Sequence, residues 1–167
     1  FDRESQQLLY HQDGKTATVS IVRLADGSLA INTNGKTDAA IMMEAGGEST
    51  TDESTMSLCA ILPLALDPGI RTEATIGLGS GLTSQTLLSY PLMTSVDTVE
   101  IEQKMIEAAR HFRPRVERVY ADPRSRIYLD DAKTFFSTYN KKYDLIVSEP
   151  SNPWVSGVAG LFSGEFY

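Results

Sequence analysis

The sequence predicts an α/β protein in which a small N-terminal β domain precedes an open parallel sheet, and three observations support this. Residues 16–33 hold two runs rich in β-branched residues, separated by turn residues. From residue 74 onward, short apolar strands alternate with helical runs, as in a parallel sheet. A polar, glycine-containing stretch at residues 44–55 separates the two parts. We therefore divide the chain into residues 1–54 and residues 55–167.

The first part is expected to form antiparallel strands joined by tight turns. Strands are predicted at residues 16–24 and 28–33, with a third short strand at 38–43. Asp26-Gly27 lies between the first two strands, and this dipeptide between β-branched runs predicts a hairpin. Asn34-Gly35 is a second turn signal of the same kind.

A helix is expected at residues 55–66, where the second part begins. Asp52 or Ser54 is placed to cap its N-terminus, because either side chain can accept a hydrogen bond from a free backbone N–H. Pro63 lies inside the helical pattern, so we expect a kink or an early end there. The turn residues at 67–69 close the helix.

The rest of the second part alternates strands and helices. Strands are predicted at residues 74–78, 96–101, 126–129 and 143–148, and helices at 83–89, 103–112 and 132–139. This order predicts a parallel sheet with helices on both faces. The chain starts at Phe1 rather than at Met, so it reads as a piece of a longer protein whose sheet is cut short. We expect a sheet edge that is exposed or paired with a partner, for example in a homodimer.

Composition narrows the class of protein. The formal net charge of −7 argues against nucleic-acid binding, which usually requires a basic surface. Cys59 is the single cysteine, so no internal disulfide forms, and a reducing, cytoplasmic compartment is expected. His11 and His111 have no cluster of ligands around them, so we expect no metal site. This piece lacks an apolar run of about 18 residues, although the parent protein could carry a membrane attachment elsewhere.

Three glycines follow the first strand of the expected parallel sheet and precede a helix. Gly77, Gly79 and Gly81 alternate with Leu78 and Ser80, and such a run lets the backbone turn tightly and approach a ligand. The compact G-x-G-x-G spacing suits a nucleoside without a pyrophosphate, because the dinucleotide form is G-x-G-x-x-G. A tight turn without a ligand is the alternative.

Acidic side chains follow the next two strands. The second strand ends in Val99-Glu100-Ile101-Glu102, about 20 residues beyond the glycines, where the carboxylate of Glu100 can accept hydrogen bonds from both hydroxyls of a ribose. Its alternative role is that of a solvated strand end. Asp130-Asp131-Ala132 follows the third strand, where a side chain can reach the amino group of adenine. The alternative is a helix N-cap, and the two aspartates can divide the two roles.

The fourth strand leads into a loop with two prolines. Glu149 follows the strand directly, so its carboxylate is expected to face the same crevice. Pro150 and Pro153 stiffen the loop, which suits a fixed site. Trp154 can form a wall of a pocket or belong to the core.

At these positions the chain resembles the spermidine/spermine synthase family, the polyamine aminopropyltransferases. The resemblance covers about 90 residues, from the glycine turn to the end of the chain, and extends more loosely over the β region and Leu62-Pro63-Leu64. Its motifs are Gly77–Gly81, Val99–Glu102, Asp122–Arg124, Asp131-Ala132, Tyr143–Ile146, Leu161-Phe162 and Glu165–Tyr167. The loop from Glu149 to Phe162 is similar to a divergent branch in which this domain is often joined to membrane segments.

The resemblance implies a small β domain followed by a Rossmann-like, S-adenosylmethionine-dependent methyltransferase fold. Members pass the aminopropyl group of decarboxylated S-adenosylmethionine to a diamine. By resemblance, Gly77, Gly79 and Gly81 line the co-substrate, Glu100 holds the ribose and Asp131 meets the adenine. Glu149 stands where members have the Asp that accepts the proton of the amine. The glycine turn also includes Ser80, and Asp130 and Ala132 flank Asp131 as further contacts.

The chain departs from the family pattern at several positions. Ser80 replaces an Asp of the glycine turn, and Asn152 replaces a second Asp after the fourth strand. Thr55 and Met56 stand where a Tyr and a Gln or His help to bind the substrate. A diamine carries two positive charges, and losing carboxylate partners makes their desolvation more costly.

These observations leave three hypotheses. The first is an aminopropyltransferase with Glu149 as base and with Asn152 and Trp154 near a small amine substrate. The second is a methyltransferase that uses ordinary S-adenosylmethionine. Ser80 and Asn152, which replace aspartates of the family, motivate it, and the change to Ser80 leaves room for the carboxylate of this co-substrate. The third is a nucleoside-binding module without catalysis. None of them involves a metal, a nucleic acid or membrane contact by this piece.

Overall fold

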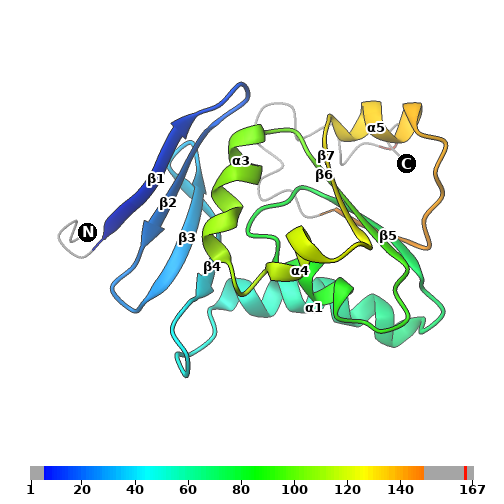
Figure 1. The fold of residues 1–167 in the computed structure, drawn as a ribbon, viewed down its shortest axis with the longest axis horizontal. Coiled ribbons are helices and arrows are strands. Elements are labelled where there is room, and N and C mark those ends of the chain that lie inside the picture. Colours follow the sequence, from blue (N-terminus) through cyan, green and yellow to red (C-terminus); the bar gives the residue numbers. More distant parts are fainter. Residues whose placement is uncertain (1–5, 149–163, 165–167) are drawn as a thin grey trace.

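The computed structural model describes residues 6–148 and 164, and in this part the chain forms two four-stranded sheets (Figure 1). The first sheet is antiparallel, with strands in the order β1-β2-β3-β4. The second is parallel, in the order β7-β6-β5-β8. The predicted arrangement of a small β domain followed by a Rossmann-like parallel sheet is confirmed.

The small sheet consists of β1 (Gln7–Asp13), β2 (Thr18–Arg23), β3 (Ser28–Thr33) and β4 (Lys36–Met42). Both predicted turns are present, and Asn34 and Gly35 adopt the left-handed backbone that such a turn needs. The strand β1 was not predicted. It is an edge strand, half-exposed to exposed along its length, so it lacks the strict alternation of apolar and polar residues that marks a half-buried strand.

The helix α1 spans Thr51–Leu66 and begins four residues before the predicted start. Its N-cap is Thr50, so the prediction of Asp52 or Ser54 was wrong. Thr50 Oγ1 accepts a hydrogen bond from Glu53 N, and the Glu53 carboxylate accepts one from Thr50 N, which is the reciprocal capping box. Asp52 instead accepts a hydrogen bond from Ala40 N of β4. The boundary expected after residue 54 falls in the first turn of α1 and stays a prediction.

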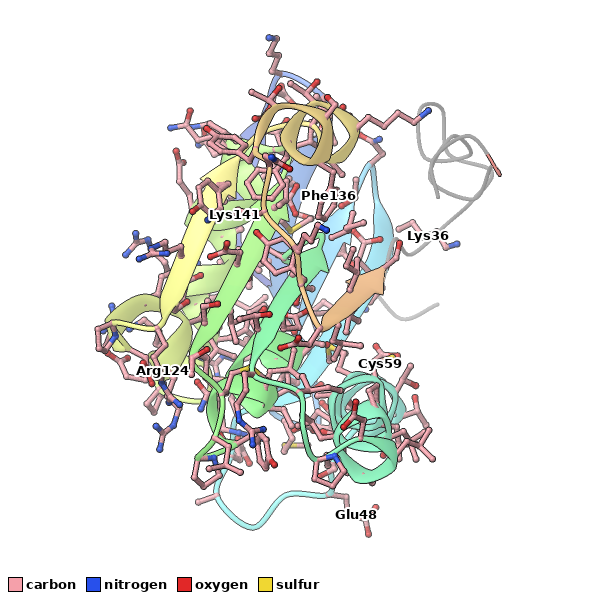
Figure 2. All side chains as sticks on the ribbon, turned by 90° about the vertical axis from the view of Figure 1, so that its right-hand side faces the viewer. Lys36, Glu48, Cys59, Arg124, Phe136 and Lys141 are labelled. Atoms are coloured by element: carbon pink, nitrogen blue, oxygen red, sulfur yellow. The ribbon has the colours of Figure 1, made fainter. Side chains whose placement is uncertain are left out.

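Pro63 does not end α1 early. The helix continues to Leu66, and Asp67 N donates a hydrogen bond of 2.9 Å to the carbonyl of Pro63. The proline removes one N–H donor from the helix. Because only three helical residues follow it, this loss falls in the last turn, next to the place where the helix ends. In Figure 2 this helix is seen nearly end-on, beside the edge strand β8.

The parallel sheet is built from β5 (Thr72–Ile76), β6 (Ser95–Glu100), β7 (Ser125–Leu129) and β8 (Leu145–Ser148). The helices between them are α2 (Leu82–Leu88), α3 (Gln103–Ala108), α4 (Glu117–Ala121) and α5 (Ala132–Thr138). The helix predicted at 103–112 is divided, because residues Ala109–Phe112 form a 3₁₀ turn. The short helix α4 was not predicted. Its five residues are too few to show helical periodicity in the sequence.

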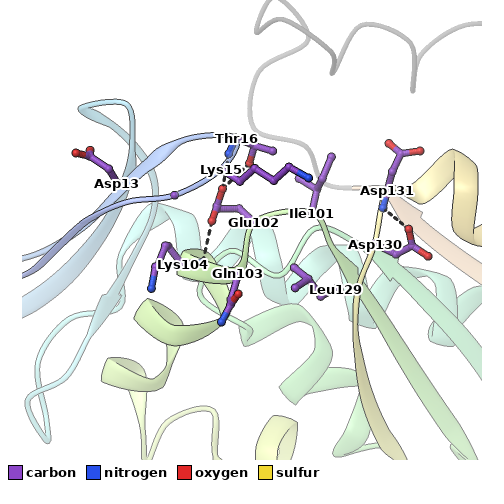
Figure 3. A pocket seen from close by; sticks show the side chains of 11 residues that line it. Asp13, Lys15, Thr16, Ile101, Glu102, Gln103, Lys104, Leu129, Asp130 and Asp131 are labelled. Carbon is purple, nitrogen blue, oxygen red and sulfur yellow. Dashed lines mark hydrogen bonds between the residues drawn. The ribbon is translucent and has the colours of Figure 1, made fainter.

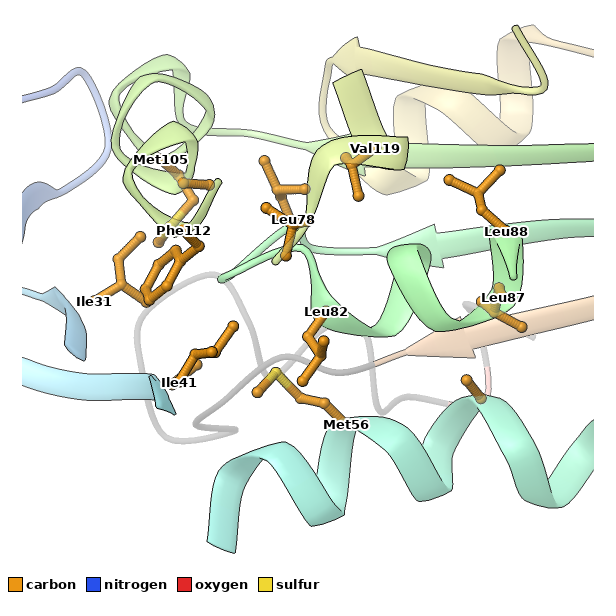
Figure 4. Close-up of a cluster of buried hydrophobic side chains, with 14 of the residues drawn as sticks. Ile31, Ile41, Met56, Leu78, Leu82, Leu87, Leu88, Met105, Phe112 and Val119 are labelled. Carbon is orange, nitrogen blue, oxygen red and sulfur yellow. The ribbon is translucent and has the colours of Figure 1, made fainter. Parts of the chain in front are cut away.

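One continuous core joins the two sheets (Figure 4). Ile31 and Ile41 of the small sheet, Met56 of α1, Leu82 of α2 and Phe112 after α3 are all buried in it. Burial of one such side chain contributes about 1.5–3 kcal/mol. On the other face of the parallel sheet, α5 packs Phe135 into a second, smaller cluster. Helices therefore cover both faces of the sheet, as predicted. Within the described residues, no helix is both long and apolar enough to cross a membrane.

Polar contacts of Arg115 and Tyr10 help to fix the small sheet against the rest of the chain. Arg115 donates hydrogen bonds to the Glu53 carboxylate and to the carbonyl of Met42 at the end of β4. Tyr10 OH of β1 donates to Glu107 Oε2 of α3 at 3.1 Å. Figure 1 shows α3 between the small sheet and the parallel sheet, so these bonds act across the contact between the two parts.

Glu73 of β5 is a fully buried carboxyl group at 0% exposure. Thr75 Oγ1 donates a hydrogen bond of 2.8 Å to Glu73 Oε1, while Oε2 has no hydrogen-bond partner among the described residues. Burial raises the pKa of Glu73 to about 8, and the charge of Asp97 adds to the rise. Glu73 is therefore largely protonated in the folded chain at neutral pH.

We predict that Glu73→Gln removes part of the pH dependence of stability. The pKa of Glu73 is higher in the folded chain than in the unfolded chain. Its contribution to the free energy of unfolding is therefore complete below pH 4.5, the ordinary pKa, and is lost as the pH rises from there to about 8. The free energy of unfolding of the wild type should fall relative to the variant by about 1.4 kcal/mol per pH unit in this range. Urea unfolding at a series of pH values measures the free energy of unfolding of the wild type and of the variant. Glu48→Gln, at an exposed position, is the control, and parallel curves for wild type and Glu73→Gln would contradict the prediction.

Candidate functional site

The glycine turn connects β5 to α2 at the carboxyl edge of the parallel sheet. Gly77, Gly79 and Gly81 all have positive φ angles of 90°, 51° and 87°, a region that glycine occupies without the cost borne by other residues. Gly77 N donates to the carbonyl of Val99 at 2.8 Å, and Gly81 N donates to the carbonyl of Leu78 at 2.8 Å. These bonds hold the turn next to the end of β6.

Glu100, the last residue of β6, lies under this turn. It is 6% exposed, so the alternative reading of a solvated strand end was wrong. Its Oε2 accepts a hydrogen bond of 2.8 Å from Leu78 N, and its Oε1 accepts one of 2.8 Å from Glu102 N. Burial raises the pKa of Glu100, and these backbone donors oppose the rise. The structure thus brings the glycine turn and Glu100 into direct contact.

Ser80, the polar residue of the turn, faces α1. Its side chain is 0% exposed, and Ser80 Oγ donates to the sulfur of Met56 at 3.1 Å. Leu82 N makes a longer contact of 3.4 Å with the same hydroxyl. Two departures from the family pattern, Ser80 and Met56, therefore contact each other.

Asp130 and Asp131 lie beyond the end of β7. Asp131 caps α5, because its Oδ1 accepts a hydrogen bond of 3.0 Å from Thr134 N. Asp130 Oδ1 accepts one of 2.8 Å from Asp131 N. The capping role considered for this pair is confirmed for Asp131. Ala132, at 7% exposure, is part of the core under α5 rather than of an open surface.

Three segments line an open pocket of about 570 Å³ beyond the carboxyl ends of β6 and β7 (Figure 3). They are residues 13–16 at the end of β1 and in the turn that follows it, residues 101–104 after β6, and residues 129–131 at the end of β7 and just beyond it. The volume is in the range of small-molecule sites, and the place is where open parallel sheets bind ligands. Asp130 and Asp131 belong to its lining, whereas Glu100 and the glycine turn do not.

The lining carries more negative than positive charge. Its acidic residues are Asp13, Glu102, Asp130 and Asp131, and its basic residues are Lys15 and Lys104. Lys104 also pairs with Glu107 at 2.9 Å, outside the lining. The arrangement can thus hold hydroxyl or amino donors, or a cation, by acceptors on several sides.

The pocket has a wall that was not predicted. Gly14, Lys15 and Thr16 come from the turn between β1 and β2, and Glu102 comes from the segment between β6 and α3. A contact across 86 residues leaves no periodic pattern in one sequence. The local pattern that could have indicated this wall is the second acidic residue of Val99-Glu100-Ile101-Glu102. From the sequence, we assigned a role to Glu100 and none to Glu102.

Comparison with known proteins identifies the family. A sequence model of the spermine/spermidine synthase domain matches residues 54–167, more than half of the chain. The chain belongs to the spermidine/spermine synthase family.

Similar proteins agree with this assignment. The polyamine aminopropyltransferases of Alkaliphilus metalliredigens and Clostridium perfringens are 36% and 33% identical over 106 residues, which are 64% of this chain and 37% of each relative. The chain thus spans well under half the length of these relatives. The crystal structure of a spermidine synthase in complex with the transition state analogue AdoDATO covers 96% of this chain with a TM-score of 0.82 and 21% identity. This chain covers 52% of that structure. The spermidine synthase of Thermotoga maritima gives a TM-score of 0.80. Both structures are 21% identical to this chain in sequence, and at such an identity the similarity shows the fold alone.

Other family motifs of the chain have structural roles. Asp122 and Arg124 form an ion pair at 2.6 Å just before β7, at the amino edge of the sheet. The guanidinium holds the pKa of Asp122 at about 2 and donates to backbone carbonyls that include Leu88 and Met93. Tyr143 OH and Lys141 Nζ both donate to Asp97 Oδ2 (Figure 2 labels Lys141). Glu149, Asn152 and Trp154 lie outside the described residues, and their roles stay predictions.

We predict that two substitutions separate the structural and ligand-binding roles of Asp131. Asp131→Asn keeps an oxygen that can cap α5, so the free energy of unfolding should change by no more than about 0.5 kcal/mol. Asp131→Ala removes the cap and should cost about 1 kcal/mol. If the carboxylate accepts a hydrogen bond from adenine, both variants should bind methylthioadenosine at least about tenfold more weakly. Urea unfolding measures the free energy of unfolding, and calorimetry measures the affinity for methylthioadenosine. Full affinity in Asp131→Asn would exclude the ligand-binding role.

Proposed function

We propose that this chain binds decarboxylated S-adenosylmethionine as the co-substrate of an aminopropyl transfer to an amine. The observation that carries the proposal is the acidic pocket at the carboxyl ends of β6 and β7, in a chain of the spermidine/spermine synthase family. This co-substrate carries a sulfonium and an ammonium group. An excess of carboxylates around it reduces the cost of removing these charges from water.

The nucleoside part of the co-substrate is assigned to the segments beside the glycine turn. The exocyclic amino group of adenine donates to Asp131, and the ribose hydroxyls donate to Glu100. Each oxygen of the Glu100 carboxylate already accepts one backbone N–H, and a carboxylate oxygen can accept two hydrogen bonds. Gly77, Gly79 and Gly81 let the backbone pass close to the ligand, where a side chain would exclude it.

The chemistry is a displacement at the carbon next to the sulfonium. The lone pair of the amine nitrogen forms the new N–C bond, the C–S bond breaks with its electrons going to sulfur, and methylthioadenosine leaves. The amine loses one proton in this step, and we assign its acceptance to Glu149 from the position of this residue in the family motif. Asn152 and Trp154 belong to the same loop and are assigned to the amine substrate. The rest of the rate comes from positioning the two reactants.

A second candidate function rests on the contact between Ser80 and Met56. Where family members place an Asp in the glycine turn, this chain has a buried hydroxyl that donates to a sulfur. No carboxylate at this position is then available to pair with an aminopropyl ammonium. A methyl transfer from ordinary S-adenosylmethionine, whose carboxylate is intact, needs no such partner.

Calorimetric titration of the chain with three ligands tests the two functions against each other. We expect methylthioadenosine to bind and decarboxylated S-adenosylmethionine to bind more tightly than S-adenosylmethionine, because the lining is acidic. Tighter binding of S-adenosylmethionine would reject aminopropyl transfer and favour methyl transfer. If no ligand of the three binds, the assignment of the pocket to a nucleoside is wrong.

The role of Glu149 is tested by kinetics on the full-length protein with putrescine as the amine. Glu149→Gln should lower kcat for spermidine formation by about 10²–10⁴-fold, the usual contribution of a general base, and should leave the affinity for methylthioadenosine unchanged. Glu149→Asp restores the residue that is typical of the family and serves as the matched control, which should keep most of the activity. Turnover of Glu149→Gln at the wild-type rate would show that another group takes the proton.

A further inference from the structure

Glu102 is a buried carboxylate whose hydrogen bonds join the two parts of the chain. It is 3% exposed, and its Oε2 accepts hydrogen bonds from Thr16 N and Thr16 Oγ1, both at 2.7 Å, and from Ala17 N at 3.3 Å. Its Oε1 accepts one of 2.9 Å from Lys104 N. Figure 3 shows this carboxylate between the turn that follows β1 and the start of α3.

Gly14 leaves the space that this contact needs. A Cβ atom at position 14 would lie 2.1 Å from Glu102 Oε1 and 2.3 Å from the carboxyl carbon, so another residue would displace the carboxylate. Gly14 does not have a positive φ angle, so the reason for glycine here is the space that the Glu102 carboxylate occupies and not the backbone conformation. Gly14 N also donates to the carbonyl of Ala17 at 2.9 Å, which closes the turn.

The bonds to Glu102 are strong because they are charge-assisted. Burial alone would raise its pKa, but the hydrogen bonds from Lys104, Thr16 and Ala17 outweigh burial and hold the pKa below the ordinary value. The group is therefore ionised at neutral pH. Hydrogen bonds to an ionised carboxylate are roughly twice as strong as those between neutral groups.

We propose that Glu102 is a positioning residue that latches the turn at residues 14–17 to the end of β6 and thereby forms one wall of the ligand pocket. The small β domain is then part of the binding site, because Gly14, Lys15 and Thr16 are its contribution to the lining. Thr16 and Ala17 are held directly, so the position of Lys15 over the pocket follows from the same carboxylate. The inference rests on the proposed function only in taking the pocket as the nucleoside site.

The test compares variants of the 167-residue chain. Glu102→Gln removes the charge and leaves one acceptor oxygen for the donors that Glu102 now satisfies. We expect the amides of Thr16 and Ala17 to exchange their hydrogens at least about tenfold faster, and methylthioadenosine to bind about tenfold more weakly. Thr16→Val removes only the bond from Oγ1, so it is the milder variant if Glu102→Gln folds poorly, and it should lower the affinity a few-fold. Gly14→Ala should act like Glu102→Gln, because the added Cβ displaces the carboxylate.

Tyr10→Phe is the matched control. It removes a different hydrogen bond between the small sheet and this region, from Tyr10 OH of β1 to Glu107 of α3, and neither residue lines the pocket. We expect this variant to lose some thermal stability with unchanged affinity for methylthioadenosine. If Glu102→Gln lowers stability and leaves the affinity at the wild-type value, as Tyr10→Phe does, the positioning role is rejected.

Failure of the latch and failure of the proposed function give different results. If the wild-type chain does not bind methylthioadenosine, the proposed function is wrong, and the amide exchange of Thr16 and Ala17 decides on the latch. Unchanged exchange of these two amides in Glu102→Gln overturns the latch whatever the ligand result. If Glu102→Gln speeds the exchange of these amides and weakens methylthioadenosine binding, while Tyr10→Phe leaves the binding unchanged, both the latch and the proposed function are supported.

Discussion

The buried carboxylate of Glu100 holds together the segments that form the site. One oxygen accepts the N–H of Leu78 in the glycine turn, and the other accepts the N–H of Glu102, where β6 has just ended. A buried carboxylate with unsatisfied oxygens would be costly, so the turn and the start of the next segment must stay where their N–H groups reach it. Glu102 is placed by this contact, and its own carboxylate then holds the turn of the small sheet.

This chain of contacts explains why the pocket lies between two sheets that have different topologies. Parallel strands bring their carboxyl ends to one edge, so β6 and β7 present Glu102, Asp130 and Asp131 together. The small sheet covers this edge from one side and supplies the turn at residues 14–17. The continuous core that includes Ile31, Met56 and Phe112 keeps the two sheets from moving apart. The site is thus a product of the contact between them.

Local patterns in the sequence predicted most of the elements and, of the pocket lining, Asp130 and Asp131. The strand at 28–33 was predicted with its observed ends, because two turn signals bound a run of β-forming residues. The capping role considered for Asp130 and Asp131 followed from residue type, and Asp131 fills it. The start of α1 was misplaced because the capping box of Thr50 and Glu53 was overlooked. The role of Glu102 depends on a partner far away in the chain, and no local pattern encodes such a contact.

A crystal structure of the chain with methylthioadenosine would test the central claim most directly. The account predicts the nucleoside in the pocket beyond β6 and β7, with Asp131 near the adenine, Glu100 near the ribose, and the turn at residues 14–17 still bound to Glu102. A nucleoside bound elsewhere, for example in the groove along α1 lined by Leu58 and Leu62, would contradict it. If the nucleoside is bound but residues 14–17 are released from Glu102, the proposal that the small β domain forms one wall of the site is contradicted.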